Sequence, residues 1–271
     1  DLTRWKLFLD KLKYPKAKVN VGLIGKYIEL QDAYKSILES FIHAGAINEC
    51  QVQVINIHSE FITSENVNEK LAGLDALLVA PGFGHRGVEG KIVAVKYARE
   101  KKLPFFGICL GMQMAAIEFA RNVLGLKSAN STEMNPDTSD PVIDLMDEQK
   151  QVTAKGGTMR LGAYPCTIEK DSLAYRIYGK EKISERHRHR WEFNNLYKEA
   201  FEKAGVVFSG TLKDGDLCEI AEVKDHPWML GVQYHPEFTS QPLKPHPLFL
   251  SFVKAAVAHH DKAYLSSATL V

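Results

Sequence analysis

The sequence lacks the features that mark membrane proteins and nucleic-acid-binding proteins. Its longest apolar runs, such as residues 76–81, are far too short to span a bilayer, and the first six residues do not resemble a secretory signal. The 34 Lys and Arg residues nearly balance the 33 Asp and Glu residues, which leaves a net charge of +1. Because no excess of basic charge is present to attract polyanions, we expect neither a nucleic-acid partner nor a membrane partner.

The sequence also has little cysteine. Its four cysteines lie far apart and form no Cys-x-x-Cys pair: Cys50, Cys109, Cys166 and Cys218. This spacing argues against a disulfide framework and against a zinc site, and it favours a reduced, cytoplasmic setting. We therefore expect no metal ligands, and each cysteine must be interpreted individually.

Strands alternate with helices in the first half of the chain, which predicts a parallel sheet covered on both faces. Asp32 is expected to cap the first of the main helices and Gly45 to end it. Apolar residues near one helical face predict a short helix within residues 1–17. The predicted strands are residues 19–25, 52–57, 74–80 and 104–108, and the predicted main helices are residues 34–45, 90–102 and 110–124.

The second half has a different pattern. Residues 206–211, 217–223 and 228–234 are strand-like and are separated by turn residues at 214–215 and 225–227, which favours an antiparallel meander. Residues 130–141 are expected to form a loop and 248–258 a closing helix, with 265–271 frayed. We predict a single α/β domain with a central, mostly parallel sheet flanked by helices and an antiparallel extension.

Gly107-Ile108-Cys109-Leu110-Gly111 has the Gly-x-nucleophile-x-Gly form of a nucleophile elbow. A sharp turn from a strand into a helix exposes the central side chain and places its sulfur at a helix N-terminus, where the thiolate is favoured. The Leu110 N–H group could then bind an oxyanion. On this pentapeptide alone, a buried, inert Cys109 is an equally good interpretation, and we assign the other three cysteines to packing.

His235 is the histidine best placed to serve as a general base. It follows an apolar strand that Pro236 must end, and Glu237 lies two residues further on, where it could orient the ring. The ends of strands are where open α/β sheets keep their sites. A surface ion pair would explain His-x-Glu equally well in isolation, so the weight of the motif comes from its coexistence with the cysteine elbow.

Residues 104–113 and 231–238 together resemble the class I (triad) glutamine amidotransferases, which have a flavodoxin-like sandwich fold. Four further motifs are similar to the C-terminal glutaminase domains of the CTP synthase family; they occupy residues 82–90, 130–133, 156–162 and 185–190. The resemblance extends from about Val19 to Phe252. It implies that residues 1–17 are a linker from an absent N-terminal amidoligase (synthetase) domain, 18–260 the glutamine amidotransferase domain, and 261–271 a C-terminal tail.

The resemblance implies a role for each matching residue in hydrolysing L-glutamine to glutamate and ammonia. Cys109 would attack the carboxamide to form a glutamyl thioester, His235 would transfer the proton, and Glu237 would orient His235. Gly82 and Leu110 would form the oxyanion hole. Substrate binding would fall to Phe83, Leu110, Gly111, Met112, Gln113, Glu133 and Arg190. One departure from the family pattern is Pro81, which replaces the first of two glycines and should stiffen the loop without abolishing activity.

The resemblance also implies properties of a complete enzyme. The synthetase domain of the same polypeptide would use ATP and Mg²⁺ to aminate UTP to CTP with the released ammonia, in pyrimidine biosynthesis. GTP would act as activator, the full enzyme would be a homotetramer, and no cofactor would bind the glutaminase domain itself. Because activity in this family depends on contact between the domains, weak glutaminase activity is expected of this chain in isolation.

Three alternatives remain open on the sequence. Residues 82–87 spell Gly-x-Gly-x-x-Gly, but this dinucleotide-binding pattern would follow the third strand rather than the first, and the next strand ends in Cys109 instead of an acidic residue. A γ-glutamyl hydrolase and a catalytically silent relative are the other two. The Arg-His-Arg-His-Arg segment at 186–190 is expected to border the site and to face the absent domain, rather than to bind metal or nucleic acid.

Overall fold

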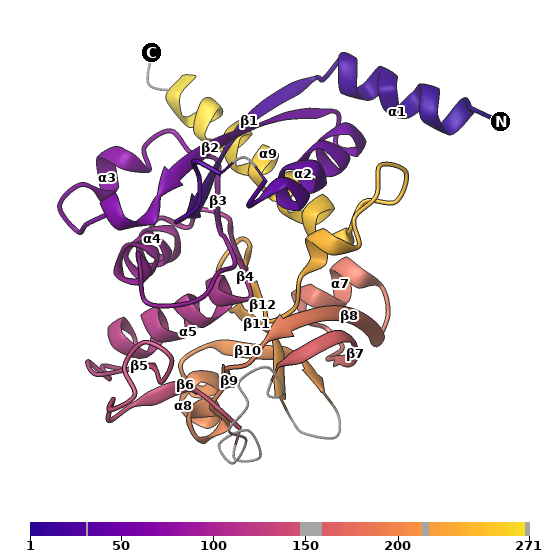
Figure 1. The fold of residues 1–271 in the computed structure, drawn as a ribbon. Coiled ribbons are helices and arrows are strands. Elements are labelled where there is room, and N and C mark those ends of the chain that lie inside the picture. The colour runs from indigo at the N-terminus through magenta and orange to yellow at the C-terminus, as the bar shows by residue number, and fades with distance from the viewer. Residues whose placement is uncertain (31, 147–158, 213–216, 269–271) are drawn as a thin grey trace.

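The computed structural model describes residues 1–30, 32–146, 159–212 and 217–268. Within them, a sheet of nine strands runs through the centre of the molecule in the order β2-β1-β3-β4-β12-β11-β10-β7-β8 (Figure 1). The predicted mostly parallel centre and its antiparallel extension are therefore confirmed, and they are continuous in one sheet.

The first five strands of this order pair in parallel. Every position of β3, β4 and β12 is buried, as expected of strands covered on both faces. The strands are β1 (Ala17–Gly25), β2 (Cys50–His58), β3 (Ala76–Val79), β4 (Phe105–Ile108) and β12 (Met229–Val232).

The remaining four strands pair antiparallel. They are β7 (Arg160–Ile168), β8 (Lys182–His189), β10 (Val206–Leu212) and β11 (Leu217–Val223). The predicted meander of residues 206–234 is confirmed by β10, β11 and β12. Both β7 and β8 were missed in the sequence, because their alternation of exposed and buried residues places charged side chains at buried positions.

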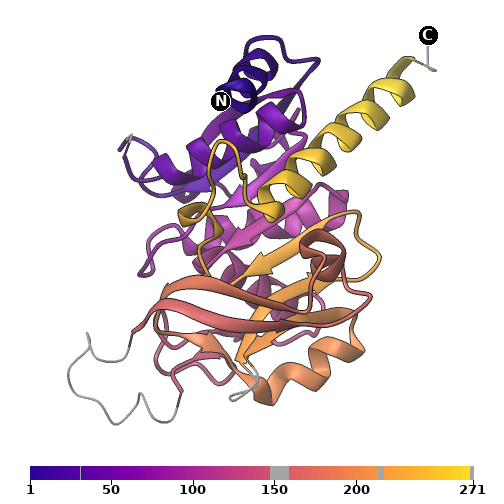
Figure 2. The same cartoon turned by 90° about the vertical axis from the view of Figure 1, so that its right-hand side faces the viewer.

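Helices cover both faces of the sheet (Figures 1 and 2). Helices α2 (Lys35–Ile47) and α9 (Pro247–Ala268) pack on one face, with α7 (Leu173–Tyr178) beside them. The other face is covered by α4 (Val88–Lys101), α5 (Leu110–Asn122), α3 (Val67–Lys70) and α8 (Lys198–Lys203). Helix α1 (Thr3–Lys13) extends away from the body, as Figure 1 shows.

A small second sheet and several short turns complete the described elements. The sheet contains β5 (Asn130–Ser131), β6 (Pro141–Asp144) and β9 (Glu192–Phe193), so the stretch predicted as loop begins and ends in short strands. The 3₁₀ turns are η1 (Ser59–Phe61), η3 (Asn195–Tyr197) and η4 (Pro236–Phe238).

Some predicted boundaries were wrong. Asp32 provides no side-chain cap, because α2 begins after Tyr34. Gly45 lies inside α2 rather than at its end, and an added Cβ there would lie 2.6 Å from the Cys50 carbonyl oxygen. Helix α9 continues to Ala268, past the predicted end at 258 and through part of the segment expected to fray. The turn at 214–215, residues 156–158 of one motif and residues 269–271 lie outside the described residues.

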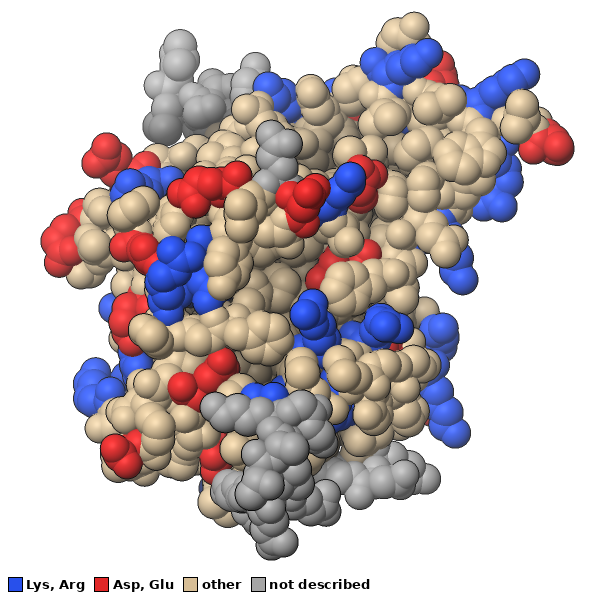
Figure 3. Space-filling view, viewed as in Figure 1, with Lys and Arg blue, Asp and Glu red and all other residues tan. Residues whose placement is uncertain are grey.

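Charged side chains are mixed on the surface. On the face drawn in Figure 3, the described Lys and Arg residues are interspersed with Asp and Glu residues. A search of the described helices finds none with the length and apolar character needed to cross a bilayer.

Candidate active site

Cys109 occupies a sharp corner between β4 and α5, as the elbow motif predicts. Its φ of +52° lies in a region that side-chain-bearing residues rarely adopt. The flanking glycines make the corner possible: an added Cβ at Gly107 would lie 2.7 Å from the Gly111 carbonyl carbon, and one at Gly111 would lie 2.2 Å from the Val79 carbonyl oxygen. The cysteine is therefore held at the carboxyl edge of the sheet by close backbone packing.

Parallel pairing of β12 with β4 brings the predicted base to the same edge. Val232 pairs with Ile108, and the Cys109 N–H group donates to the Val232 carbonyl oxygen at 2.7 Å. His235 follows three residues later, and its Nδ1 lies 2.7 Å from Glu237 Oε1. The Phe238 ring stacks on the imidazole at a centroid distance of 5.0 Å. The carboxylate and the aromatic ring thus fix the orientation of His235.

The pKa of His235 is raised to about 10, although the ring is buried. Burial alone would lower this pKa, but the charge of Cys109, a hydrogen-bonding interaction with its sulfur, and Glu237 together outweigh the desolvation. Within the described residues, His235 Nε2 is buried and accepts or donates no hydrogen bond of ordinary geometry, so it is available for proton transfer. The electrostatics therefore favour the imidazolium form of His235.

Two adjoining cavities bring most of the predicted site residues together. One, of about 330 Å³, is lined by Gly82, Phe83, Cys109, His235 and Glu237 among others. The second, of about 780 Å³, is lined by Phe83, Glu133 and Arg190, and it shares Phe83 and Arg188 with the first. Pro81 lines the first cavity as well.

The two predicted oxyanion-hole residues are neighbours. Leu110 is the first residue of α5, so its N–H group has no carbonyl partner within the helix. An added Cβ at Gly82 would lie 3.5 Å from Leu110 Cδ2. Both residues therefore lie beside Cys109, where their N–H groups could bind developing negative charge.

Two buried lysines, which the sequence analysis missed, hold the loop that contains Gly82. Lys91 Nζ donates to the Ala80 carbonyl oxygen at 3.1 Å, and Lys26 Nζ donates to the Phe83 carbonyl oxygen. Lys91 is fully buried, and its pKa is lowered to about 7 by burial and by the charge of Lys26. Two features of the sequence could have indicated these lysines: Lys26 directly follows the first strand, and Lys91 lies on the apolar side of a predicted helix.

Glu133 is also tied to this loop. Its Oε1 accepts a hydrogen bond from the Gly84 N–H group at 2.8 Å. Burial raises the pKa of this carboxyl group, while the Gly84 hydrogen bond and the charges of Lys26 and Arg190 act in the opposite direction. Glu133 thus lines the second cavity while its carboxyl group is tied to the loop.

Other predicted substrate-binding residues lie deeper. Gln113 is buried and donates from Nε2 to the Trp191 carbonyl oxygen at 3.1 Å. The Met112 side chain lines an apolar cavity with Phe105 and Phe193, and Gly111 packs its backbone on Val79. Any contact of Gly111 or Met112 with a substrate would therefore come from the backbone.

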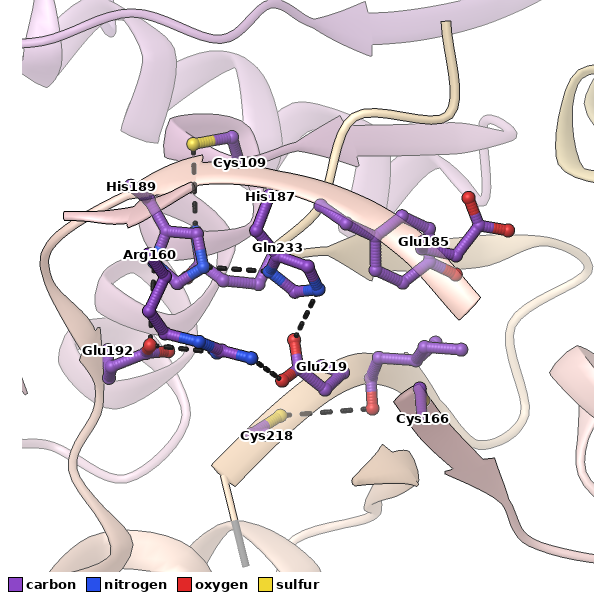
Figure 4. Close-up of polar contacts among 12 residues, drawn as sticks. Cys109, Arg160, Cys166, Glu185, His187, His189, Glu192, Cys218, Glu219 and Gln233 are labelled. Carbon is purple, nitrogen blue, oxygen red and sulfur yellow. Dashed lines mark hydrogen bonds and ion pairs between the residues drawn. The ribbon is translucent and has the colours of Figure 1, made fainter. Parts of the chain in front are cut away.

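A buried cluster of charged and titratable side chains lies beneath the cysteine (Figure 4). Arg160 donates to Glu192 at 2.9 Å and to Glu219 at 2.8 Å. His187 contacts His189 through ring nitrogens at 2.9 Å, and its Nε2 lies 3.4 Å from Glu219. The motif at 186–190 is thus a strand that turns its two histidines inward and exposes Arg186 and Arg188.

Burial determines how this cluster is charged. It raises the pKa of Glu192 to about 8 and lowers that of His187 to about 3, and it also raises the pKa of Glu219. The carboxylates of Glu192 and Glu219 raise the pKa of Arg160 despite its burial. Burial therefore disfavours charge on the two carboxyl groups and on both histidines, and Arg160 is the counter-charge that offsets this for Glu192 and Glu219.

The other cysteines differ from Cys109 in their surroundings. All four thiols are free and buried. Burial raises the pKa of Cys50 to about 11 and raises the pKa of Cys166 and Cys218 as well, as expected for packing residues. A search of the described residues finds no group of His, Cys, Asp and Glu side chains that could hold a metal ion.

Comparisons with known proteins agree with this geometry. The family model of class-I glutamine amidotransferases matches residues 29–255. The chain is 64% identical to a CTP synthase of Christiangramia forsetii and 54% identical to one of Geobacter metallireducens; each alignment covers 97% of the chain but 48% and 49% of the relative. The chain thus spans about half the length of the curated relatives it matches.

The solved structures include a relative of similar extent. The glutaminase domain of Trypanosoma brucei CTPS, with bound acivicin, superimposes with a TM-score of 0.84 at 37% identity, over 89% of this chain and 94% of that one. A putative GMP synthase subunit of Thermoplasma acidophilum shares the fold at a TM-score of 0.57 and 14% identity. The chain belongs to the class-I glutamine amidotransferase family and, within it, groups with the glutaminase domains of CTP synthases.

Proposed function

We propose that this chain hydrolyses L-glutamine to glutamate and ammonia with Cys109 as nucleophile, His235 as proton carrier and Glu237 as the residue that orients His235. The observation that carries the proposal is the convergence of a strained cysteine and a Glu-paired histidine, 126 residues apart in sequence, on one cavity. Family membership supports it independently.

The proposed reaction proceeds in two halves. The Cys109 thiolate attacks the carboxamide carbon, and the N–H groups of Leu110 and Gly82 stabilise the resulting oxyanion. His235 donates its proton to the departing nitrogen, so that ammonia leaves and a glutamyl thioester remains. His235 then takes a proton from water, which attacks the thioester, releases glutamate and regenerates the thiolate. Glu237 keeps the ring in one tautomer throughout.

The second cavity supplies complementary groups for the amino-acid end of glutamine. The Glu133 carboxylate suits the α-ammonium group, and the Arg190 guanidinium suits the α-carboxylate. Phe83, which is 41% exposed, borders both cavities and would lie beside the substrate. Gln113, Leu110, Gly111 and Met112 would set the floor of the site, the last two through backbone atoms.

We further propose that the ammonia serves a synthetase portion of a longer CTP synthase, because the relatives are about twice as long as this chain. That portion would use ATP and Mg²⁺ to aminate UTP, GTP would activate it, and the complete enzyme would be a cytoplasmic homotetramer. Four free thiols fit a reducing compartment. Weak glutaminase activity is expected of this chain without its synthetase partner.

Covalent labelling with an electrophilic glutamine analogue tests the assignment. Acivicin, which is bound in the Trypanosoma relative, should form a covalent adduct with Cys109, with its halide as the leaving group, and excess glutamine should slow the labelling. The Cys109→Ala variant should show no adduct, whereas Cys166→Ala, a matched change at a buried thiol, should be labelled like the wild type. Adducts on Cys166 or Cys218, or no adduct in the wild type, would remove the hydrolase proposal.

A further inference from the structure

Gln233 contacts the sulfur of Cys109, and no role has yet been assigned to it. It follows β12, whose register with β4 places it next to the elbow, and its backbone N–H group donates to the Glu219 carbonyl oxygen at 2.9 Å. Its side-chain Nε2 lies 3.6 Å from Cys109 Sγ, a contact drawn in Figure 4. Gln233 is fully buried, so this contact is shielded from water.

A second glutamine determines which way the Gln233 amide faces. Gln113 Nε2 donates both to the Trp191 carbonyl oxygen at 3.1 Å and to Gln233 Oε1 at 3.2 Å. Because a backbone carbonyl only accepts, the Gln113 nitrogen must face it, and the oxygen of Gln233 must then face Gln113. The chain of donors therefore runs in one direction and ends with an N–H group aimed at the sulfur.

A donor in this position acts on the anionic form of the sulfur. A hydrogen bond to a charged group favours that form, and the effect is stronger in a buried, low-dielectric site. The amide is neutral at all working pH values, so it neither competes for the proton nor adds a repelling charge. Among the described residues, the titratable groups whose pKa responds to the charge of Cys109 are His235 and Lys91.

We propose that Gln233 is a positioning residue of the glutaminase reaction: its side-chain amide donates to Cys109 Sγ, which holds the thiolate ready for attack, and its oxygen fixes Gln113. The inference rests on the proposed function insofar as Cys109 is the nucleophile. It adds a residue that couples the sulfur to the predicted substrate-binding glutamine. A merely structural role would only satisfy buried amides and would leave the reactivity of the sulfur unchanged.

The test follows the rate of Cys109 alkylation by iodoacetamide against pH in this chain, with the adduct located by mass spectrometry. In Gln233→Met, which keeps the length but has no N–H donor, we expect the profile to move to higher pH and the rate at pH 7 to fall about tenfold, the factor that matches a charged hydrogen bond of about 1.4 kcal/mol. In Gln233→Glu the fall should be larger, because a carboxylate also repels the thiolate.

Two further variants provide a control and a safeguard. Gln53→Met, the same change at an exposed position of the edge strand β2, should leave the profile unchanged. Gln113→Met leaves Gln233 in place but removes the donor that orients the Gln233 amide. The alkylation profile should therefore move to higher pH, by less than in Gln233→Met. If circular dichroism shows that the Gln233 variants do not fold, the alkylation profile of Gln113→Met tests the proposal in their place.

Steady-state kinetics complete the design. Glutaminase kcat should fall in Gln233→Met with a smaller change in KM, because the lost N–H donor acts directly on the nucleophile, whereas substrate binding is affected only through Gln113. Folded Gln233 variants with the wild-type alkylation profile would overturn the inference, even if the wild type is labelled at Cys109 by acivicin. Absence of that acivicin adduct in the wild type would instead remove the proposed function.

Discussion

The two halves of the sheet bury different kinds of side chain. In the parallel half (β2, β1, β3, β4 and β12), the central strands β3, β4 and β12 contain no charged residue. In the antiparallel half (β11, β10, β7 and β8), strand interiors bury Arg160, Glu185, His187 and Glu219. The strands that position the Cys109 sulfur are therefore apolar, whereas the neighbouring antiparallel strands bury a polar network.

The two halves of the sheet are stabilised in different ways. Apolar strands packed on both faces give a rigid edge on which a strained cysteine and its base can be held. The buried polar strands instead depend on matched partners, since an unpaired buried charge costs several kcal/mol. The halves meet where β12 pairs with β11, beside Gln233, whose backbone N–H group donates to the Glu219 carbonyl oxygen and whose side chain contacts the sulfur.

The largest expected effect concerns the ion pair at the edge of the parallel half. In Cys109→Ala, the charge and the hydrogen-bonding interaction that raise the pKa of His235 are removed, while desolvation remains. We expect this pKa to fall from about 10 toward the ordinary value near 6.5. NMR titration of ¹⁵N-labelled imidazole measures the change.

A control variant and the pH dependence of stability both bear on the pKa of His235. Cys166→Ala removes a buried thiol that does not contribute to the pKa of His235 and should leave the titration unchanged. In the wild type, a raised pKa stabilises the folded state fully below pH 6.5, and that contribution is lost as the pH rises through about 10. A His235 that titrates near 10 in Cys109→Ala would show that Glu237 alone sets its charge.

The next effect tests the polar half. Arg160→Met would leave Glu219 without its counter-charge, and we expect a loss of about 3–5 kcal/mol in the free energy of unfolding. Adding Glu192→Gln and Glu219→Gln to this variant should recover much of the loss, because neither carboxyl partner of Arg160 is then left without a counter-charge. Urea denaturation followed by circular dichroism measures both.

The matched comparison is an exposed pair. Lys203 lies on the surface and contacts Glu199, so Lys203→Met should leave the urea midpoint unchanged. If Arg160→Met were tolerated equally well, the buried cluster would not be a charged network, and the contrast between the two halves would fail.

A smaller, pH-dependent effect is expected at Lys91, the buried cation beside the parallel half. Its pKa is about 7 in the folded protein and 10.5 in the unfolded chain, so the unfolded chain binds more protons between these values. Wild-type stability should therefore rise with pH across this window relative to Lys91→Met, by up to about 1.4 kcal/mol per pH unit.

Urea denaturation between pH 7 and pH 9 measures this difference, and Lys96→Met, at an exposed position of the same helix, supplies the control. The Lys96 difference should not vary with pH. Parallel stability curves for Lys91→Met and wild type would instead indicate that the pKa of Lys91 is not lowered in the folded protein, so that the side chain stays protonated throughout this window.

The sequence predicted the parallel half well because its signals are local. Apolar runs, helical periodicity and the elbow around Cys109 each arise within a few residues. The strands β7 and β8 were missed because Arg160, His187 and His189 acquire their partners only in the folded chain, from β9 and β11. The same reason hides the contacts that Lys26 and Lys91 make with the loop around Gly82, and the contact of Gln233 with the sulfur, since no spacing in the sequence encodes these contacts.

The smallest expected effect concerns helix starts in the two halves. In the antiparallel half, Ser172 caps α7 by accepting from the Tyr175 N–H group at 3.0 Å, whereas α2, on the parallel half, begins after Tyr34 without a side-chain cap. Ser172→Ala should cost about 1 kcal/mol of stability, because a part-buried N–H group at the start of the helix loses its acceptor. The control is Ser36→Ala, in the exposed first turn of α2, which should change the urea midpoint little. An equal loss of stability in both variants would mean that the capping hydrogen bond of Ser172 makes no contribution of its own.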